Sequence, residues 1–345
     1  MLGNSNNEGT LTNYSELMEE EMYESQGFHA SSDVPLVMVA ILIIVVNGYI
    51  TLLISGRRDL RTPSNLILAS LTISDGLTGL VTVPLVMTCT ITETNDVCIS
   101  SAVFVRFISI LSAVHILLLT LDRYIFIVCA NKYYDLVRKN RIMFLLLGIW
   151  SMSIIVTAIR LDWAVEADVY GKEDNTEKEI ELNRKERIFN WFCLVAFFFI
   201  PLIITVILDA ELLFVLKRQV RKILQNNLLH ARQGQTMKTK NRERRAVIVY
   251  IIVVVTFIIC WLPYFLYDLW QHWGSLPSTV EYLIMYIRII TSLSNPIMYT
   301  LSHRTLRRAV IVSLRRTLGL KRHHRFRGTS GGFTAQINRT DTTQM

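Results

Sequence analysis

The sequence predicts an all-α membrane protein: a seven-transmembrane helix bundle with a short amphipathic helix on its inner face. The chain has 345 residues, of which 51% are hydrophobic and only 19% are charged, whereas a soluble domain usually carries about 25% charged residues. Charges are almost absent from seven long stretches, and about 20 helical residues cross the hydrocarbon core of a bilayer. Lys and Arg are concentrated in alternate connecting segments. This pattern argues against a soluble enzyme, a disulfide-rich secreted domain and a disordered chain.

Four of the seven apolar stretches contain no Asp, Glu, Lys or Arg, namely residues 34–55, 142–159, 188–208 and 246–267. The other three contain one such residue each: Asp75 in 62–92, Arg106 in 97–121 and Arg288 in 282–302. Prolines and glycines inside the stretches are tolerated in membrane helices, because neighbouring helices satisfy the freed backbone groups. These residues are Gly48, Pro84, Pro201, Pro263 and Pro296. The alternating pattern of a membrane barrel is absent, so we expect seven helices.

The connecting segments predict the orientation of the chain in the plasma membrane. Segments 56–61, 129–141, 217–245 and 303–345 hold 27 Lys and Arg residues and four acidic residues. Segments 1–33, 89–97, 160–187 and 268–281 hold six Lys and Arg residues and 20 acidic residues. Because the basic side of a membrane protein is the cytoplasmic side, we expect the N-terminus outside and the C-terminus inside. The net charge of +8 then faces anionic lipid and cytosolic partners, and needs no nucleic acid.

The seven-helix bundle is expected over residues 34–302. Residues 1–33 predict a disordered extracellular segment without a cleavable signal peptide, and Asn13-Tyr14-Ser15 is a glycosylation sequon within it. Residues 303–318 predict an amphipathic helix on the inner membrane face, since apolar positions share one side that arginines flank. Residues 319–345 predict a disordered cytoplasmic tail.

Polar residues inside the spans are candidates for function, because they are costly in a bilayer. Asp75 has two interpretations: a carboxyl that is hydrogen-bonded between helices, or the anchor of a hydrated monovalent cation. Oxygen-bearing residues in other spans could complete a cation site around it, namely Asn47, Ser112, Ser292 and Asn295. Hard cations prefer such oxygen ligands.

The inner end of the third stretch carries Asp122-Arg123-Tyr124, and Glu243 lies at the same depth before the sixth. Arg123 could pair with Asp122 locally and with Glu243 across helices, and such a pair is a natural switch element. Pro263, after Cys260-Trp261-Leu262, is expected to kink the sixth span. Each motif alone could reflect boundary residues or packing.

In combination, one hallmark per span occurs in the order found in rhodopsin-like (class A) G-protein-coupled receptors, which the chain resembles from about residue 34 to residue 318. The hallmarks are Asn47, Leu71-Thr72-Ile73-Ser74-Asp75, Cys98, Asp122-Arg123-Tyr124, Trp150, Pro201, Phe257 with Cys260-Trp261-Leu262-Pro263, and Asn295-Pro296-Ile297-Met298-Tyr299. The resemblance implies a pocket for an extracellular ligand and a surface for a heterotrimeric G protein. Arrestin binding through the Ser/Thr-containing tail is a further expectation.

The resemblance also implies roles for matching residues. Asp75, Ser112, Ser292 and Asn295 correspond to an allosteric sodium site, and no other metal or cofactor is expected. Arg123 with Glu243 corresponds to an inactive-state ion pair within the G-protein-coupling set Asp122, Arg123, Tyr124, Glu243 and Tyr299. Trp261 corresponds to a rotamer switch beneath the pocket, with Phe257, Pro263 and Pro201 as further switch elements.

The chain departs from the family pattern at several positions. Segment 160–187 has no Cys, so the usual bridge to Cys98 cannot form. Either a short Cys89–Cys98 bridge or a free Cys98 is compatible with the sequence. Ala113 and Asp209 stand where the family often has a bulky residue and a Tyr, respectively.

The subfamily is not resolved: the spans are similar to those of amine and lipid receptors, but Val105 stands where amine receptors have their anchoring Asp. The absence of Lys from 282–302 argues against an opsin. We expect a pocket lined by Val105, Arg106, Cys193, Phe197, Trp261, Tyr264, Asp268, Met285 and Arg288, with a carboxylate or phosphate ligand. Alternatively, Arg106 snorkels outward and Arg288 pairs internally. A cationic amine or peptide held by Asp268 or Glu281 is the other ligand hypothesis.

Other function classes fit less well. A transporter is the second hypothesis, but inverted repeats and paired interrupted helices are not evident. An enzyme is not expected, because no nucleophile, base or metal constellation converges. His115 is the one His within a span, and it is interpreted as a packed, hydrogen-bonded residue.

Overall fold

The computed structural model describes residues 30–170, 176–228, 277–302 and 304–317, together with residues 252, 255–256, 258–267 and 269–270. Several features predicted from the sequence lie outside these residues. They are Asn13 and the rest of residues 1–29, Glu243, Phe257, Asp268, the tail 319–345, and the side chain of Tyr299.

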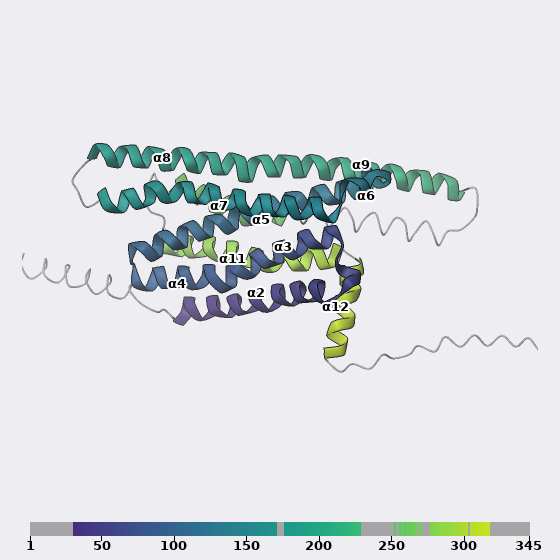
Figure 1. The fold of residues 1–345 in the computed structure, drawn as a ribbon, viewed down its shortest axis with the longest axis horizontal. Coiled ribbons are helices and arrows are strands. Elements are labelled where there is room, and N and C mark those ends of the chain that lie inside the picture. Colours follow the sequence, from purple (N-terminus) through teal and green to yellow (C-terminus); the bar gives the residue numbers. More distant parts are fainter. Residues whose placement is uncertain are drawn as a thin grey trace, which may run out of the picture.

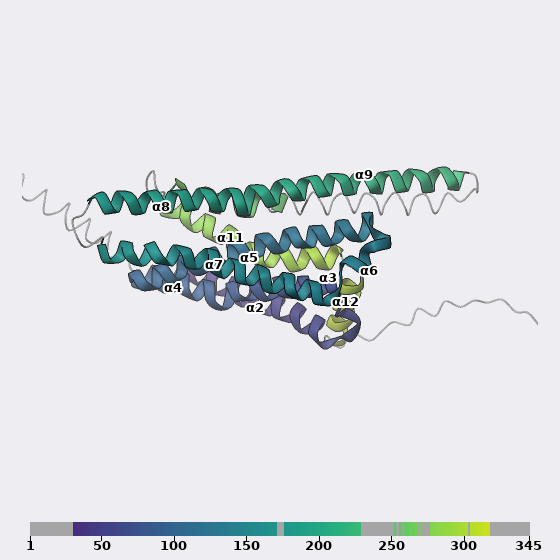
Figure 2. The same cartoon turned by 45° about the horizontal axis from the view of Figure 1, so that its top comes forward.

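The described regular elements are all helices. The long ones are α2 (Ala30–Gly56), α3 (Pro63–Leu77), α4 (Val83–Thr92), α5 (Asn95–Val128), α7 (Lys139–Tyr170), α8 (Thr176–Leu194), α9 (Ile200–Leu228), α11 (Ser278–Ser302) and α12 (Arg304–Thr317). Short turns of helix are η1 (Arg58–Leu60), η3 (Ala130–Lys132) and α6 (Tyr133–Leu136). Figures 1 and 2 show the long helices side by side along one axis, with α12 turned away from the bundle at one end. We call this the α12 end, and we call the opposite end, where α4 meets α5, the Cys98 end.

Five helical segments among the described residues are long and apolar enough to cross a membrane. They are Asp33–Gly56, Pro63–Thr92, Asn95–Val128, Lys139–Leu161 and Ile180–Val215. The shorter apolar helix Ile258–Tyr267 lies in the sixth predicted stretch, and α11 covers the seventh. The helices extend beyond the apolar stretches. Their polar end residues continue the helical backbone hydrogen bonds outside the hydrocarbon region.

Among the described residues, two spans contain a turn of π-helix. In the second span, η2 (Thr78–Thr82) joins α3 to α4, and in the fifth, η4 (Val195–Phe199) joins α8 to α9. Pro84 follows η2 and Pro201 follows η4. A proline lacks the amide hydrogen of a regular ladder, and π-turns inside α-helices are found frequently at functional sites.

Close contact between α2 and η2 depends on Gly79. A Cβ atom at this position would lie 2.6 Å from the backbone oxygen of Ala40. Small residues allow membrane helices to approach closely, since packing rather than water exclusion drives their association. Gly79 therefore sets the spacing of the first two spans.

Three clusters of buried apolar side chains pack the interior of the bundle. One apolar cluster at the α12 end includes Ile54, Leu71, Leu119, Tyr133 and Leu306. A second lies between α5, η4 and the Ile258–Tyr267 helix, and a third lies between α2, α4 and α11. Many apolar side chains on the outer faces are exposed, among them Met38, Leu52, Phe144, Ile155 and Phe214, as expected where lipid is the solvent.

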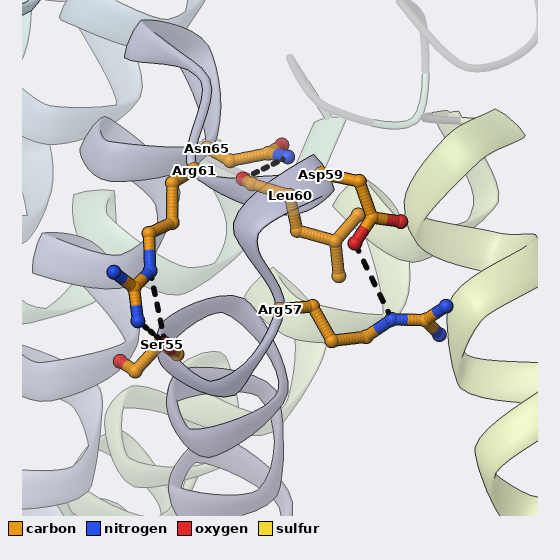
Figure 3. Close-up of polar contacts among 6 residues, drawn as sticks. All are labelled: Ser55, Arg57, Asp59, Leu60, Arg61 and Asn65. Atoms are coloured by element: carbon orange, nitrogen blue, oxygen red, sulfur yellow. Dashed lines mark hydrogen bonds and ion pairs between the residues drawn. The ribbon is translucent and has the colours of Figure 1, made fainter.

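The connection between α2 and α3 is fixed by its own polar contacts (Figure 3). The Arg61 guanidinium donates from Nε to the Ser55 carbonyl oxygen at 3.0 Å, and its Nη2 donates to the same oxygen. The Asn65 amide donates to the Leu60 carbonyl oxygen at 2.8 Å, and Arg57 lies 3.6 Å from Asp59. Leu60 itself is buried, so the basic loop is anchored to the α12 end of the core.

Candidate functional site

A buried polar cluster lies midway along the bundle and joins α2, α3 and α11. The Asn295 amide donates to Asp75 Oδ2 at 2.9 Å. The Asn47 amide donates to the carbonyl oxygens of Ile43 and Ser292, both at 3.0 Å, and the Ser292 hydroxyl donates to Thr78 Oγ1 at 3.2 Å. The structure therefore brings together three helices through the polar residues that the sequence singled out.

Part of this cluster has hydrogen-bonding capacity left over. Asn47 Oδ1 is buried and has no hydrogen-bond partner among the described residues. Ser112 is buried on α5, which packs against α3. Carboxylate, amide and hydroxyl oxygens are suitable ligands for a hard cation, so the residues present fit a sodium ion chemically. The Asn295–Asp75 bond equally fits a carboxyl that is hydrogen-bonded between helices, and the sodium site stays a prediction.

The α12 end of α5 carries the Asp-Arg-Tyr motif, and its three side chains have different surroundings. Asp122 is buried and accepts a 3.0 Å hydrogen bond from the Tyr133 hydroxyl on α6. Burial and the neighbouring Asp122 carboxylate raise the pKa of the Tyr133 phenol above its ordinary value, so Tyr133 is a neutral donor at physiological pH. Tyr124 donates a 2.7 Å hydrogen bond to Glu211 Oε2 on α9. The predicted Arg123–Glu243 pair lies outside the described residues.

Toward the Cys98 end, two guanidinium groups are buried inside the bundle. Arg106 is only 2% exposed; its Nη1 donates to Asn190 Oδ1 at 2.8 Å, and its guanidinium carbon lies 5.3 Å from the centre of the Phe189 ring. Arg288 is 6% exposed and lies 5.6 Å from the centre of the Tyr264 ring. Arg106 therefore points into the protein and does not snorkel outward.

Most of the predicted pocket residues belong to one apolar cluster beside these arginines. Cys193, Phe197, Trp261 and Tyr264 are buried in it, and Val105 packs against it. Met285 packs against the cluster between α2, α4 and α11. Asp268 lies outside the described residues.

His115 is part of a hydrogen-bonded chain across three helices. His115 Nδ1 lies 2.7 Å from the Leu111 carbonyl oxygen, which can only accept, so this nitrogen carries the proton. Nε2 is then an acceptor, and it lies 2.8 Å from the Ser70 hydroxyl. Trp150 Nε1 donates in turn to Ser70 Oγ at 3.0 Å. Each polar group is satisfied, and His115 has the packed role that the sequence indicated.

The structure joins Cys89 to Cys98 by a disulfide, with the two Cα atoms 4.8 Å apart. The bond links the last turn of α4 to the first turn of α5. Between them Glu93 adopts a left-handed conformation with φ of 49°, which ends α4 and turns the chain. Among the described residues Cys129, Cys193 and Cys260 form no disulfide.

Several residues of these networks were not singled out from the sequence, namely Ser70, Thr78, Tyr133, Asn190 and Glu211. Asn190 is a polar residue near the start of the fifth apolar stretch, and a polar residue in such a stretch could have marked it as a candidate for function. Ser70 had no comparable signal, because serines in membrane helices often bond to their own backbone.

The family model described as "7 transmembrane receptor (rhodopsin family)" matches residues 46–299 of the chain. The chain belongs to this receptor family. The fold class predicted from the sequence, a seven-helix membrane bundle, is thereby confirmed. Rhodopsin-family members are receptors rather than enzymes, so the expectation that the chain is no enzyme holds, and the transporter hypothesis loses its basis. The chain is thus a multi-pass plasma-membrane receptor whose partners are an extracellular ligand and a heterotrimeric G protein.

Individual members of the rhodopsin family are similar to the chain along most of their length. The histamine H2 receptor of Rattus norvegicus is 24% identical over 304 residues, which cover 83% of this chain and 80% of that receptor. Trace amine-associated receptor 1 of Mus musculus is 23% identical over 293 residues, covering 79% and 85%, respectively. The 5-hydroxytryptamine receptor 1D of Homo sapiens is 22% identical over 345 residues, covering 82% and 88%.

Proposed function

We propose that this receptor binds a ligand carrying a carboxylate or phosphate group near the Cys98 end and activates a G protein at the α12 end. In this proposal the N-terminus and the Cys98 end are extracellular, while the C-terminus and the α12 end are cytoplasmic. The excess of Lys and Arg in the segments at the α12 end supports that orientation. Arg123 is the side chain expected to contact the G protein.

The observation that carries the ligand proposal is the pair of buried guanidinium groups. Arg106 and Arg288 place two positive charges among aromatic rings, away from the screening effect of water. Attraction for an anion is stronger at low dielectric constant than in bulk water, and the planar guanidinium binds carboxylate and phosphate through two parallel hydrogen bonds. The apolar part of the ligand would lie against Phe197, Trp261 and Tyr264.

A cationic amine is the second candidate, and two observations favour it. Similar receptors are named for histamine, trace amines and 5-hydroxytryptamine. Glu281 near the outer end of α11 accepts a 3.1 Å hydrogen bond from the Tyr267 hydroxyl, so it could act as the acidic anchor that Val105 cannot supply. Against this candidate, the two buried arginines repel a cation.

Matched ligand pairs would separate the two candidates. Cells expressing the receptor are exposed to aryl-ethylamines, to aryl carboxylates of the same ring systems and to lysophospholipids, and cAMP and calcium are measured together. We expect responses to the anionic compounds, a loss of potency with Arg106→Gln or Arg288→Gln, and a smaller loss with Arg106→Lys, which keeps the positive charge but not the two parallel hydrogen bonds.

The amine candidate makes the opposite prediction. It requires responses to the amines, a collapse of potency with Glu281→Gln or Asp268→Asn, and parental potency in the arginine variants. Surface expression of each variant, measured with an N-terminal tag on intact cells, is the control. That tag also tests orientation, since it is reachable without permeabilisation only if the N-terminus is outside.

Two accessory partners complete the proposal. A sodium ion would be held by Asp75, Ser112, Ser292 and Asn295, and the spare acceptor Asn47 Oδ1 nearby supports this assignment. Arrestin would bind the tail 319–345 after phosphorylation of its Ser and Thr residues, since phosphates provide charge-assisted contacts for arginine clusters.

A further inference from the structure

Asp209 on α9 is an ionisable residue in an unusual environment. Its side chain is 5% exposed. Both carboxylate oxygens are buried, and neither has a hydrogen-bond partner among the described residues. A buried carboxylate without hydrogen bonds is costly, and an ionisable residue within a membrane span is a candidate for function. Packing alone therefore does not account for an Asp at this position.

The turn of α9 that carries Asp209 lies at the level of the Asp-Arg-Tyr motif of α5, and the two helices pack against each other. The hydrogen bond from Tyr124 to Glu211 joins the two helices at this level with an oxygen–oxygen distance of 2.7 Å. Arg123 immediately precedes Tyr124, and it is the charged group whose field acts on the Asp209 carboxylate. The attraction acts through space, because the Asp209 oxygens carry no hydrogen bond.

The carboxylate of the motif itself already has a hydrogen-bond donor. Asp122 accepts the hydrogen bond of Tyr133 on α6, and the charge of Arg123 acts on Asp122 as well as on Asp209. A rotamer change of the long Arg123 side chain would satisfy the buried Asp209 oxygens and form a charge-assisted pair, which is roughly twice as strong as a neutral hydrogen bond.

We infer that Asp209 is a positioning residue for Arg123: the α9 carboxylate attracts the guanidinium between α5 and α9 and withholds it from the G protein. The inference rests on the proposed coupling role of Arg123. An internal anion and a docked partner compete for the same cation, so the internal anion shifts the population toward the uncoupled receptor. Asp209 restrains basal signalling in addition to the predicted partner Glu243.

The first test measures basal nucleotide exchange on purified G proteins by membranes that contain equal amounts of receptor. Asp209→Asn removes the charge and keeps the shape, and we expect basal exchange to rise roughly three- to ten-fold, since a shift of about 1 kcal/mol changes a population ratio about fivefold. The matched control is Glu211→Gln, which neutralises a carboxylate two residues further along α9 and keeps an acceptor for Tyr124. Unchanged or reduced exchange with Asp209→Asn would overturn the restraint.

The second test does not depend on coupling. The thermal midpoints of the purified parent, Arg123→Gln, Asp209→Asn and the double variant form a double-mutant cycle. If the two charges interact, the effects of the single variants on the thermal midpoint fail to add in the double variant. Additive effects would overturn the pairing. If no receptor, including the parent, promotes exchange, then the proposed coupling fails, while the cycle still decides whether the pair exists.

Discussion

The amide of Asn295 donates a hydrogen bond to the carboxylate of Asp75, with 2.9 Å between Nδ2 and Oδ2. This bond joins α3 to α11 in the middle of the bundle, between residues 220 positions apart in sequence. Both side chains are buried, so the bond forms in an environment of low dielectric constant, where such contacts are strong. Relative motion of α3 and α11 must break it or carry both residues along.

Sodium should lower basal G-protein activation if Asp75 anchors the ion, because the cation would stabilise the hydrogen-bonded cluster of the inactive receptor. Replacing NaCl by N-methylglucamine chloride at constant ionic strength should then raise basal nucleotide exchange. Asp75→Asn should abolish this difference, while Ser74→Ala should retain it, because the Ser74 hydroxyl donates to the Leu71 carbonyl oxygen of its own helix. Exchange that is independent of sodium in the parent protein would leave Asp75 as a neutral, hydrogen-bonded carboxyl.

Gly79→Ala should destabilise the receptor, since the new Cβ would lie 2.6 Å from a backbone oxygen of α2. Overpacking of this kind typically costs about 1–3 kcal/mol, and the thermal midpoint in detergent should fall by several degrees. Gly48→Ala is the matched control, because its Cβ would meet no atom within 4 Å and alanine is the better helix former by about 1 kcal/mol. Equal midpoints for the two variants would refute the close-packing role of Gly79.

Ser70→Ala should destabilise the receptor by about 1–3 kcal/mol, the usual cost of leaving buried polar groups unsatisfied. The change removes the hydroxyl between Trp150 Nε1 and His115 Nε2. Thermal unfolding would measure the loss. Thr72→Ala, which also removes a hydroxyl from α3, is a comparison that leaves the three-helix chain intact. A Ser70→Ala variant as stable as the parent would show that the chain contributes nothing.

Breaking the Cys89–Cys98 bond should lower the thermal midpoint, because a disulfide closing a short loop contributes roughly 2–3 kcal/mol. The paired change Cys89→Ser and Cys98→Ser provides the variant, and Cys129→Ser, at a free thiol, provides the control. Thiol labelling under denaturing conditions checks the bond directly. Of the five cysteines, three should react before reduction and all five after it.

The features that depend on the bilayer could be predicted from the sequence. Apolar length, charge asymmetry and one motif per span predicted the helical fold class, since a membrane leaves the backbone few alternatives. The relationship between Asp75 and Asn295 was also foreseeable, because both are costly polar residues at the same depth. Arg106 shows where such reasoning stops. Its partner Asn190 is 84 residues away, and only the packing of α5 against α8 determines that the side chain turns inward.

Local backbone geometry was equally hidden from the sequence. The apolar stretch 62–92 looks continuous, yet it contains η2 between two α-helical parts. Asp209 appeared only as a departure from a family pattern, and its relationship to Arg123 required the register of α5 against α9. Apolar periodicity reports which residues are inside a bundle, but it does not report which interior residues meet.

The π-turns η2 and η4 have a consequence for how positions correspond between this receptor and its relatives. A π-turn accommodates an additional residue within the helix, and one residue corresponds to a rotation of about 100° around the axis. Relative to Asp75, the side chains that follow Thr82 therefore point in the direction that the neighbouring residue would have in a helix without the bulge. In the fifth span, Asn190 and Cys193 are rotated in the same way relative to Pro201. Where a relative lacks the bulge, a residue-by-residue alignment would assign its ligand contacts to the wrong side of these two helices.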